Sequence, residues 1–267
     1  MILKCFEMQN TGLQEYKFCS IYQFVSIVTE AVDGKLNFWN FNNELFVQSA
    51  LKFKKISLLH IFVSCTLYNY YSSYFKKSGD CVEEDDIEWW IDMMKEYDIK
   101  LKRASYNIDK DGGEATWVWF QKNENTFLVF FEVIADEIVH ILFNDKQFLV
   151  KFNRLVRDVI IDEDGLYADI IKWPDGTLNE NGTIKRCIIP QWVKNAVYHR
   201  DKGRCVFCNK DLTGLVNMLN KENFDHIIPL KDYGTNDPCN IQLTCETCNK
   251  SKGGKDVEPK YKYQSWW

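Results

Sequence analysis

Apolar side chains recur at helical spacing through much of the first part of the chain. Between residues 43 and 76 they lie near an i, i+3/i+4 stripe, which predicts one or two helices. Residues 145–161 have the same spacing and predict a further helix. Residues 85–100 begin with two aspartates, which favour the first turn of a helix. Residues 16–32 carry apolar residues at mixed helical spacing.

Other segments predict β-structure and domain limits. Residues 2–8 favour a strand, and residues 117–133 resemble a hairpin because two aromatic and apolar runs flank the polar residues 122–125. Turn-forming residues are frequent from residue 162 to residue 189. The fold class we expect is α+β, with a mixed α+β accessory domain over 1–161, a junction over 162–189 and a second domain over 190–267.

The composition is that of a folded protein. Hydrophobic residues make up 46% and aromatic residues 15% of the 267 residues, which excludes wholesale disorder. The longest apolar stretch, 56–71, is interrupted by polar residues and fits a buried helix better than a membrane span. The N-terminal residues have no long apolar run of the kind found in secretion signals, so we expect a cytoplasmic protein with no membrane partner.

Charge is distributed unevenly along the chain. From Thr183 onward lysine and arginine outnumber aspartate and glutamate by 14 to 9, whereas acidic residues outnumber basic ones by 29 to 19 in residues 1–182. A basic C-terminal part suits phosphate binding. The acidic part is a poor nucleic-acid surface. We expect it to bind a protein, to self-associate or to restrain the basic part, although an ordinary solvated acidic surface explains the charge equally well.

Two Cys-x-x-Cys pairs, Cys205/Cys208 and Cys245/Cys248, stand in the basic part. Each such pair can fold as a tight knuckle that directs two thiolates at one Zn²⁺ ion. Disulfides are the alternative, but they need an oxidising compartment. The pattern therefore favours a structural zinc site. The remaining cysteines show no ligand spacing and are expected to be reduced thiols: Cys5, Cys19, Cys65, Cys81, Cys187 and Cys239.

Between and after these pairs stand residues suited to hydrolysis. The imidazole of His226 has an ordinary pKa near 6.5 and can accept a proton at neutral pH. Asp225 and Asn249 offer oxygen ligands, which suit Mg²⁺ or Mn²⁺. Adjacent side chains of a strand point to opposite faces, so Asp225 and His226 can share a site only at a strand edge with a helix packed across it. Purely structural roles for both remain the alternative.

The order of these residues resembles that of the HNH (ββα-metal) endonuclease family. The resemblance covers about residues 190–257 and includes the helix and turn before the first cysteine pair. The motif continues from the first pair through the following positions: Asp225-His226-Ile227-x-Pro229, then Asn240-x-Gln242-x-x-Cys245-x-x-Cys248-Asn249-x-x-Lys252. One position departs from the family name, because Asn249 stands where many members have histidine.

The resemblance implies a β-hairpin with Asp225-His226 on its first strand, followed by a short helix. It implies that Asp225 and Asn249 ligate a catalytic Mg²⁺ or Mn²⁺, that His226 is the general base, and that Asn240 holds the loop between the strands. Lys250, Lys252 and Lys255 follow Asn249 directly and are expected to contact phosphates.

The substrate implied by the resemblance is DNA, double-stranded rather than single-stranded. The range of the family favours a restriction enzyme or an antiphage-defence effector, by analogy of fold alone. The alternative from another class is a non-catalytic zinc module that binds nucleic acid or scaffolds a larger complex.

Overall fold

The computed structural model describes residues 15–34, 43–77, 84–103, 108–161, 171–213 and 223–259. The chain divides into two compact units. One unit comprises Met1–Phe41 and Phe62–His140, and the other comprises Asn42–Ile61 and Ile141–Trp267. No helix within the described part of the chain is both long and apolar enough to cross a bilayer.

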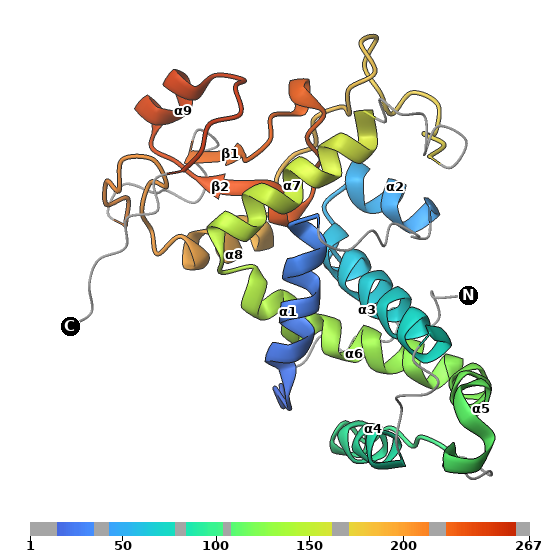
Figure 1. The fold of residues 1–267 in the computed structure, drawn as a ribbon. Coiled ribbons are helices and arrows are strands. Elements are labelled where there is room, and N and C mark those ends of the chain that lie inside the picture. Colours follow the sequence, from blue (N-terminus) through green and yellow to red (C-terminus); the bar gives the residue numbers. More distant parts are fainter. Residues whose placement is uncertain are drawn as a thin grey trace. The chain divides into compact units, whose positions relative to one another are not determined.

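All the regular secondary structure described in the first unit is helical (Figure 1). It holds α1 (Ile21–Val32), most of α3 (Leu58–Lys77), α4 (Glu84–Glu96), α5 (Ile108–Lys122) and nearly all of α6 (Glu124–Leu142). Aromatic rings fill its core: the Trp90 and Phe127 ring centroids lie 5.0 Å apart, and those of Phe75 and Phe120 also lie 5.0 Å apart. Such contacts add to the stabilisation that comes from burying the rings.

The hairpin expected over 117–133 is wrong. These residues lie in α5 and α6, which are separated at Asn123. The amide of Asn123 accepts a hydrogen bond from the Lys102 N–H and donates one to the Trp119 carbonyl, so the polar stretch forms a break between two helices. Buried positions in α6 recur at helical spacing: Phe127, Phe130, Phe131, Ile134, Ala135 and Ile138. This period of 3.6 outweighs the β propensity of the aromatic residues.

The helices predicted from apolar spacing are confirmed. Residues 43–76 form α2 (Asn43–Leu51) and α3, and 145–161 form α7 (Lys146–Ile161). The segments 16–32 and 85–100 contain α1 and α4. The strand expected at 2–8 and residues 162–170 of the junction lie outside the described residues. In the rest of the junction, Leu178 and Ile184 form an antiparallel bridge on either side of the turn at residues 180–181.

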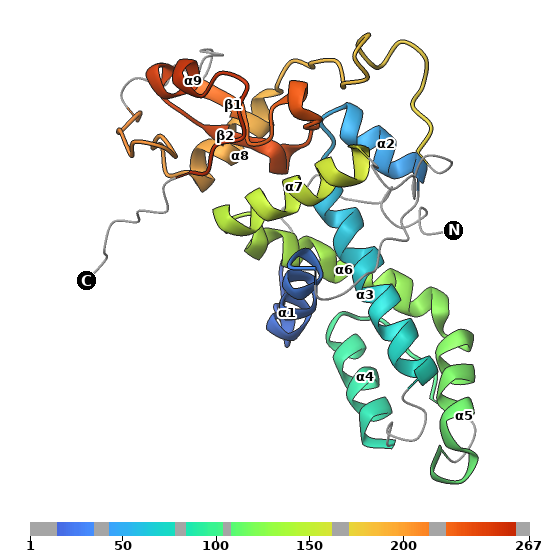
Figure 2. The same ribbon diagram turned by 45° about the horizontal axis from the view of Figure 1, so that its top comes forward.

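The second unit contains the only sheet within the described residues, a two-stranded hairpin. Strand β1 (Phe224–His226) pairs antiparallel with β2 (Ile241–Leu243), with Asp225 opposite Gln242. The helical elements of this unit are α2, the first turn of α3, α7, α8 (Gln191–Arg200), η3 (Leu230–Asp232), η4 (Pro238–Asn240) and α9 (Glu246–Lys252). Figures 1 and 2 both show α9 beside the two strands. The predicted α+β class is therefore confirmed for the chain.

Helix α8 holds the second strand through one buried ion pair. The Asp201 carboxylate, just after α8, accepts a hydrogen bond from the Leu243 N–H at 2.8 Å. The Arg200 guanidinium is paired with Asp201 at 2.9 Å and donates to the Ile241 carbonyl at 2.6 Å. Both side chains are almost fully buried. Their charges are compensated by each other and by the strand backbone, which is the condition for burying charge without large cost.

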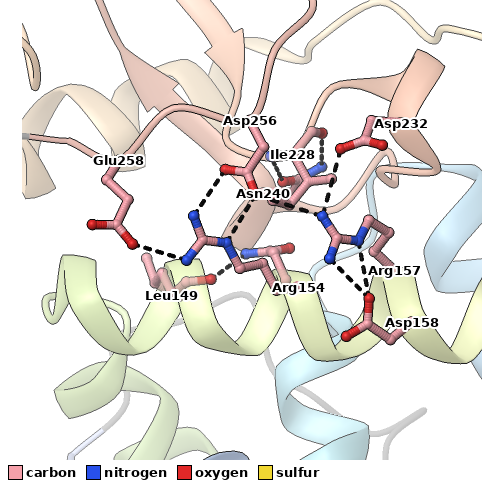
Figure 3. A network of polar contacts seen from close by, with 10 residues as sticks. Leu149, Arg154, Arg157, Asp158, Ile228, Asp232, Asn240, Asp256 and Glu258 are labelled. Carbon is pink, nitrogen blue, oxygen red and sulfur yellow. Dashed lines mark hydrogen bonds and ion pairs between the residues drawn. The ribbon is translucent and has the colours of Figure 1, made fainter.

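Helix α7 packs against η4 and holds the segment after α9 (Figure 3). Arg154 makes a two-pronged ion pair with Asp256, at 2.8 and 3.2 Å, and a third contact with Glu258 at 2.9 Å. Arg157 lies 3.5 Å from Asp232 and 3.5 Å from Asp256. Helix α7, which we expected in the accessory domain, thus contacts both η4 and the segment after α9.

Candidate metal and catalytic centre

The four paired cysteines meet at one point. Their sulfur atoms all lie within 4.8 Å of one another, and the Cys208 and Cys245 sulfurs are 3.7 Å apart. Four thiolates at about 2.3 Å from one Zn²⁺ would be about 3.8 Å from each other in a tetrahedron. The described cysteines form no disulfide. The cluster therefore has the ligands and the spacing for one structural zinc ion.

Backbone contacts explain how the two knuckles come together. In the first, the Asn209 N–H donates to the Cys205 carbonyl, and Asn209 takes the left-handed conformation that a tight turn requires, with φ at 60°. The Val206 N–H donates to the Leu243 carbonyl at 3.0 Å and attaches this knuckle to β2. In the second, Cys245 is the N-cap of α9, and its sulfur accepts from the Cys248 N–H at 3.4 Å. The zinc site thus joins the strand to the helix.

Asp225 lies on β1 and contacts the last residue of α9. Its Oδ2 atom accepts hydrogen bonds from the Lys252 ammonium at 2.7 Å and from the Gln242 amide at 3.3 Å. Lys252 is the last residue of α9, and Asn249 stands one turn before it. Residues three apart share a helix face, so the face of α9 that carries Asn249 is directed towards β1. We expected Asp225 and His226 to share one site only if a helix packs across their strand. Helix α9 fulfils this condition.

His226 is fully buried at the end of β1. Within the described residues, neither ring nitrogen has a hydrogen-bond partner. Burial, together with the positive charges of Arg186 and Lys252, lowers the pKa of His226 to about 3, although the nearby Asn236 side chain acts in the opposite direction. The imidazole is therefore neutral at neutral pH, which is the form that accepts a proton. A low pKa also makes it a weaker base than an exposed histidine.

Asn240 closes the segment that connects the strands. Its Oδ1 atom accepts from the Ile228 N–H at 2.9 Å, and its Nδ2 atom donates to the carbonyls of Ile228 at 3.0 Å and Thr235 at 2.9 Å. The side chain is fully buried. Because Ile228 follows His226 by two residues, these bonds fix the backbone just beyond the histidine.

Residues 205–255 match the family model of HNH endonucleases. The C-terminal part of the chain is an HNH domain. The expected resemblance is thereby confirmed over this segment, and the domain supports a nuclease-type function with nucleic acid as partner. Comparison with curated proteins and with solved structures found no match.

The three lysines after Asn249 in the HNH domain differ in exposure. Lys250 and Lys255 are exposed, and Lys250 forms an ion pair with Glu246 one turn earlier. Lys252, which we expected to contact phosphates, is instead buried, with 4% of its surface exposed. Its ammonium is held by Asp225 and by the His226 carbonyl, at 2.6 Å from the latter. The two exposed lysines remain predicted phosphate contacts.

Sequence reasoning missed two partners of Asp225 in the HNH domain. Gln242 lies opposite Asp225 in the hairpin register, and Lys252 lies one helical turn after Asn249. Gln242 and Lys252 both belong to the motif, so their positions relative to Asp225 and Asn249 could be read from the sequence. Their common target became visible only once the strand pairing and the packing of α9 were known.

A cavity of about 260 Å³ opens beside β1 in the second unit. Its lining includes Phe224, two residues before His226, together with Lys194 of α8. Residues 186–189, at the end of the junction, complete the lining. Alternation along a strand places Phe224 and His226 on the same face, so the cavity adjoins the face of β1 that carries the histidine.

Proposed function

We propose that this protein is a metal-dependent endonuclease that hydrolyses phosphodiester bonds in double-stranded DNA. One observation carries the proposal: within an HNH domain, Asp225, next to His226, contacts Lys252 one turn after Asn249 on α9, and this helix begins at the four-cysteine cluster. This arrangement supports a site in which oxygen ligands and a neutral imidazole share one end of the hairpin.

Asp225 and Asn249 would hold the catalytic cation. Both offer oxygen atoms, which suit Mg²⁺ or Mn²⁺. Among the described residues the hydrogen bonds to the Asp225 carboxylate all go to Oδ2, which leaves Oδ1 for a cation. The cation would polarise a phosphoryl oxygen and offset charge on the leaving oxygen.

His226 would accept the proton of the attacking water, for which its neutral ring has a free lone pair. Asn240 contributes indirectly, because two of its side-chain hydrogen bonds hold the backbone at Ile228 and so orient the end of β1. Since the His226 ring is fully buried, binding of DNA must be accompanied by a local rearrangement that exposes it.

Lys250 and Lys255 are the proposed phosphate contacts. Both are exposed, Lys250 on α9 and Lys255 just after it, in the part of the chain where basic residues predominate. Contacts of this kind carry no base information, so replacing both by glutamine should weaken binding to all DNA sequences equally. It should also lower the salt dependence of binding by about two counterions.

The acidic residues 1–182 are proposed to hold a protein partner or to mediate self-association, since their charge opposes DNA binding. A nuclease joined to such a region suits a restriction enzyme or an antiphage-defence effector.

A second candidate function is a non-catalytic zinc module that binds nucleic acid or scaffolds a complex. The complete burial of His226 favours it, because a general base has to reach its substrate. This module would bind DNA and keep its zinc but would not cleave.

Cleavage of plasmid DNA distinguishes the two functions. The zinc-loaded protein should cut with Mg²⁺ or Mn²⁺ and should be inactive after chelation of the added cation. His226→Gln, which retains much of the side-chain volume, should abolish cutting while zinc content and DNA affinity stay near wild type. Wild-type cutting by His226→Gln would remove the general base from the proposal. Binding without cutting under every cation would favour the scaffold.

A further inference from the structure

The ammonium group of Lys252 lies inside the HNH domain. The side chain is 1% exposed, and its Nζ atom is 2.7 Å from Asp225 Oδ2 and 2.6 Å from the His226 carbonyl oxygen. The Gln242 amide donates to the same Oδ2 atom. One oxygen of the carboxylate is thus engaged by two donors from two different elements, which fixes the orientation of the group.

The ion pair also decides the charge that a cation would meet. Asp225 and Lys252 cancel each other, and Asn249 carries no charge. A divalent cation bound at Asp225 would be repelled by an ammonium group only a few ångströms away, and in a buried site this repulsion is weakly screened. Mg²⁺ is usually held by one or two carboxylates together with phosphates of the substrate. Because Asp225 and Lys252 together carry no net charge, the negative charge that attracts the cation has to come from a phosphate of the substrate.

We propose that Lys252 is a positioning residue that makes cation binding at Asp225 depend on bound nucleic acid. The inference rests on the proposed function, because it takes Asp225 as a ligand of the catalytic cation. Lys252 fixes Oδ2, leaves Oδ1 for the cation and weakens cation binding until the phosphodiester adds negative charge. The cation and DNA then bind cooperatively, and each raises the affinity of the other by the same factor.

Lys252→Gln tests the effect of the positive charge separately from that of the hydrogen bonds to Asp225 and the His226 carbonyl. The glutamine amide has no charge but keeps two N–H donors. Calorimetric titration of Mn²⁺ into the zinc-loaded full chain without DNA should show binding that is roughly tenfold tighter or more than in the wild type. Lys252→Arg keeps the positive charge and should bind Mn²⁺ as weakly as the wild type. Asp225→Asn provides the blank, since it should lack this Mn²⁺ site.

Lys231→Gln is the matched control. It removes the same charge from an exposed position of the same domain. Solvent screens such a charge, so the Mn²⁺ affinity of the DNA-free protein should not change. An equal gain in affinity in Lys231→Gln and Lys252→Gln would indicate a general field effect and would overturn the assignment to Lys252.

A second measurement begins with a protein that keeps Lys252, so its first result does not depend on how well Lys252→Gln folds. In a His226→Gln background, a short DNA duplex should raise the affinity of the otherwise unchanged protein for Mn²⁺ by at least about tenfold. The same duplex should have a smaller effect when Lys252→Gln is added. Absence of coupling between Mn²⁺ and DNA in the His226→Gln protein would overturn the inference.

The outcomes separate this inference from the proposed function. If the wild type cleaves DNA with Mn²⁺ and Lys252→Gln binds Mn²⁺ no more tightly than the wild type, only the role of Lys252 is wrong. If the wild type neither cleaves DNA nor binds Mn²⁺ in its presence, the proposed function fails and the inference fails with it.

Discussion

The Asp237 carboxylate accepts a hydrogen bond from the backbone N–H of Leu58 at 2.7 Å, across 179 residues of sequence. Leu58 is the first residue of α3, and Asp237 is also the N-cap of η4, where it accepts from the Cys239 N–H. One buried carboxylate therefore caps two helical elements. It ties the segment before α3 to the loop of the HNH domain.

Replacing Asp237 by asparagine should reveal how the contribution of this carboxylate to the free energy of unfolding depends on pH. Burial raises its pKa to about 6, although the N–H groups of Leu58 and Cys239 act in the opposite direction. A pKa above the unfolded value of about 3.9 means that its contribution is most favourable below pH 4 and is lost as the pH rises through 6. The stability of the wild type relative to Asp237→Asn should therefore fall by on the order of 2 kcal/mol between pH 4 and 7. Urea unfolding at several pH values measures this, and a constant difference would contradict it.

Cys208→Ser should remove the zinc ion and destabilise the HNH domain. The mutation deletes one of four clustered ligands, and a small module of this type gains folding free energy from its metal. Metal analysis should show about one zinc per wild-type chain and a loss in the variant, together with faster proteolysis. Cys19→Ser is the control, because Cys19 lies outside the cluster. A zinc content in Cys208→Ser equal to that of the wild type would contradict the site.

Asn240→Ala should destabilise the protein by about 2–4 kcal/mol. The mutation leaves the N–H and carbonyl of Ile228 and the carbonyl of Thr235 without their side-chain partner in a buried place. Denaturant unfolding of the zinc-loaded protein gives the value. Asn195→Ala is a fair comparison, since its contact with Gln191 lies at the surface, and it should cost less than about 0.5 kcal/mol.

Residues 183–267 alone should not fold as they do in the full chain. The missing segments provide the Leu58 N–H for Asp237, the Asn153 amide for the Cys239 carbonyl at 2.9 Å, and the Leu51 carbonyl for Asn236 at 2.9 Å. They also provide the Arg154 contacts to Asp256 and Glu258 (Figure 3). Thermal unfolding followed by circular dichroism with zinc present should give a broad or low transition. A sharp transition at the temperature of the full chain would show that the fragment is autonomous.

Several features of the site could be predicted because they depend on local spacing. Two residues between paired cysteines suffice to form a knuckle, and Asp225-His226, Asn240 and Asn249 follow one another in the order that the HNH resemblance rests on. The helical period of 43–76 and 145–161 likewise predicts helices without knowledge of the fold. The hairpin expected at 117–133 failed because β propensity was given more weight than the period of the buried residues.

The sequence alone therefore determined the zinc ligands, the motif and most of the helices. Only the tertiary structure decided that Lys252 is buried on Asp225, that His226 is closed off from solvent and that Asp237 caps α3. Spacing along the chain tells which face of an element a side chain occupies. Burial and ion pairing depend on which elements pack on that face, and here the partners lie 27 and 179 residues away. That packing is a property of the whole fold and not of any local pattern.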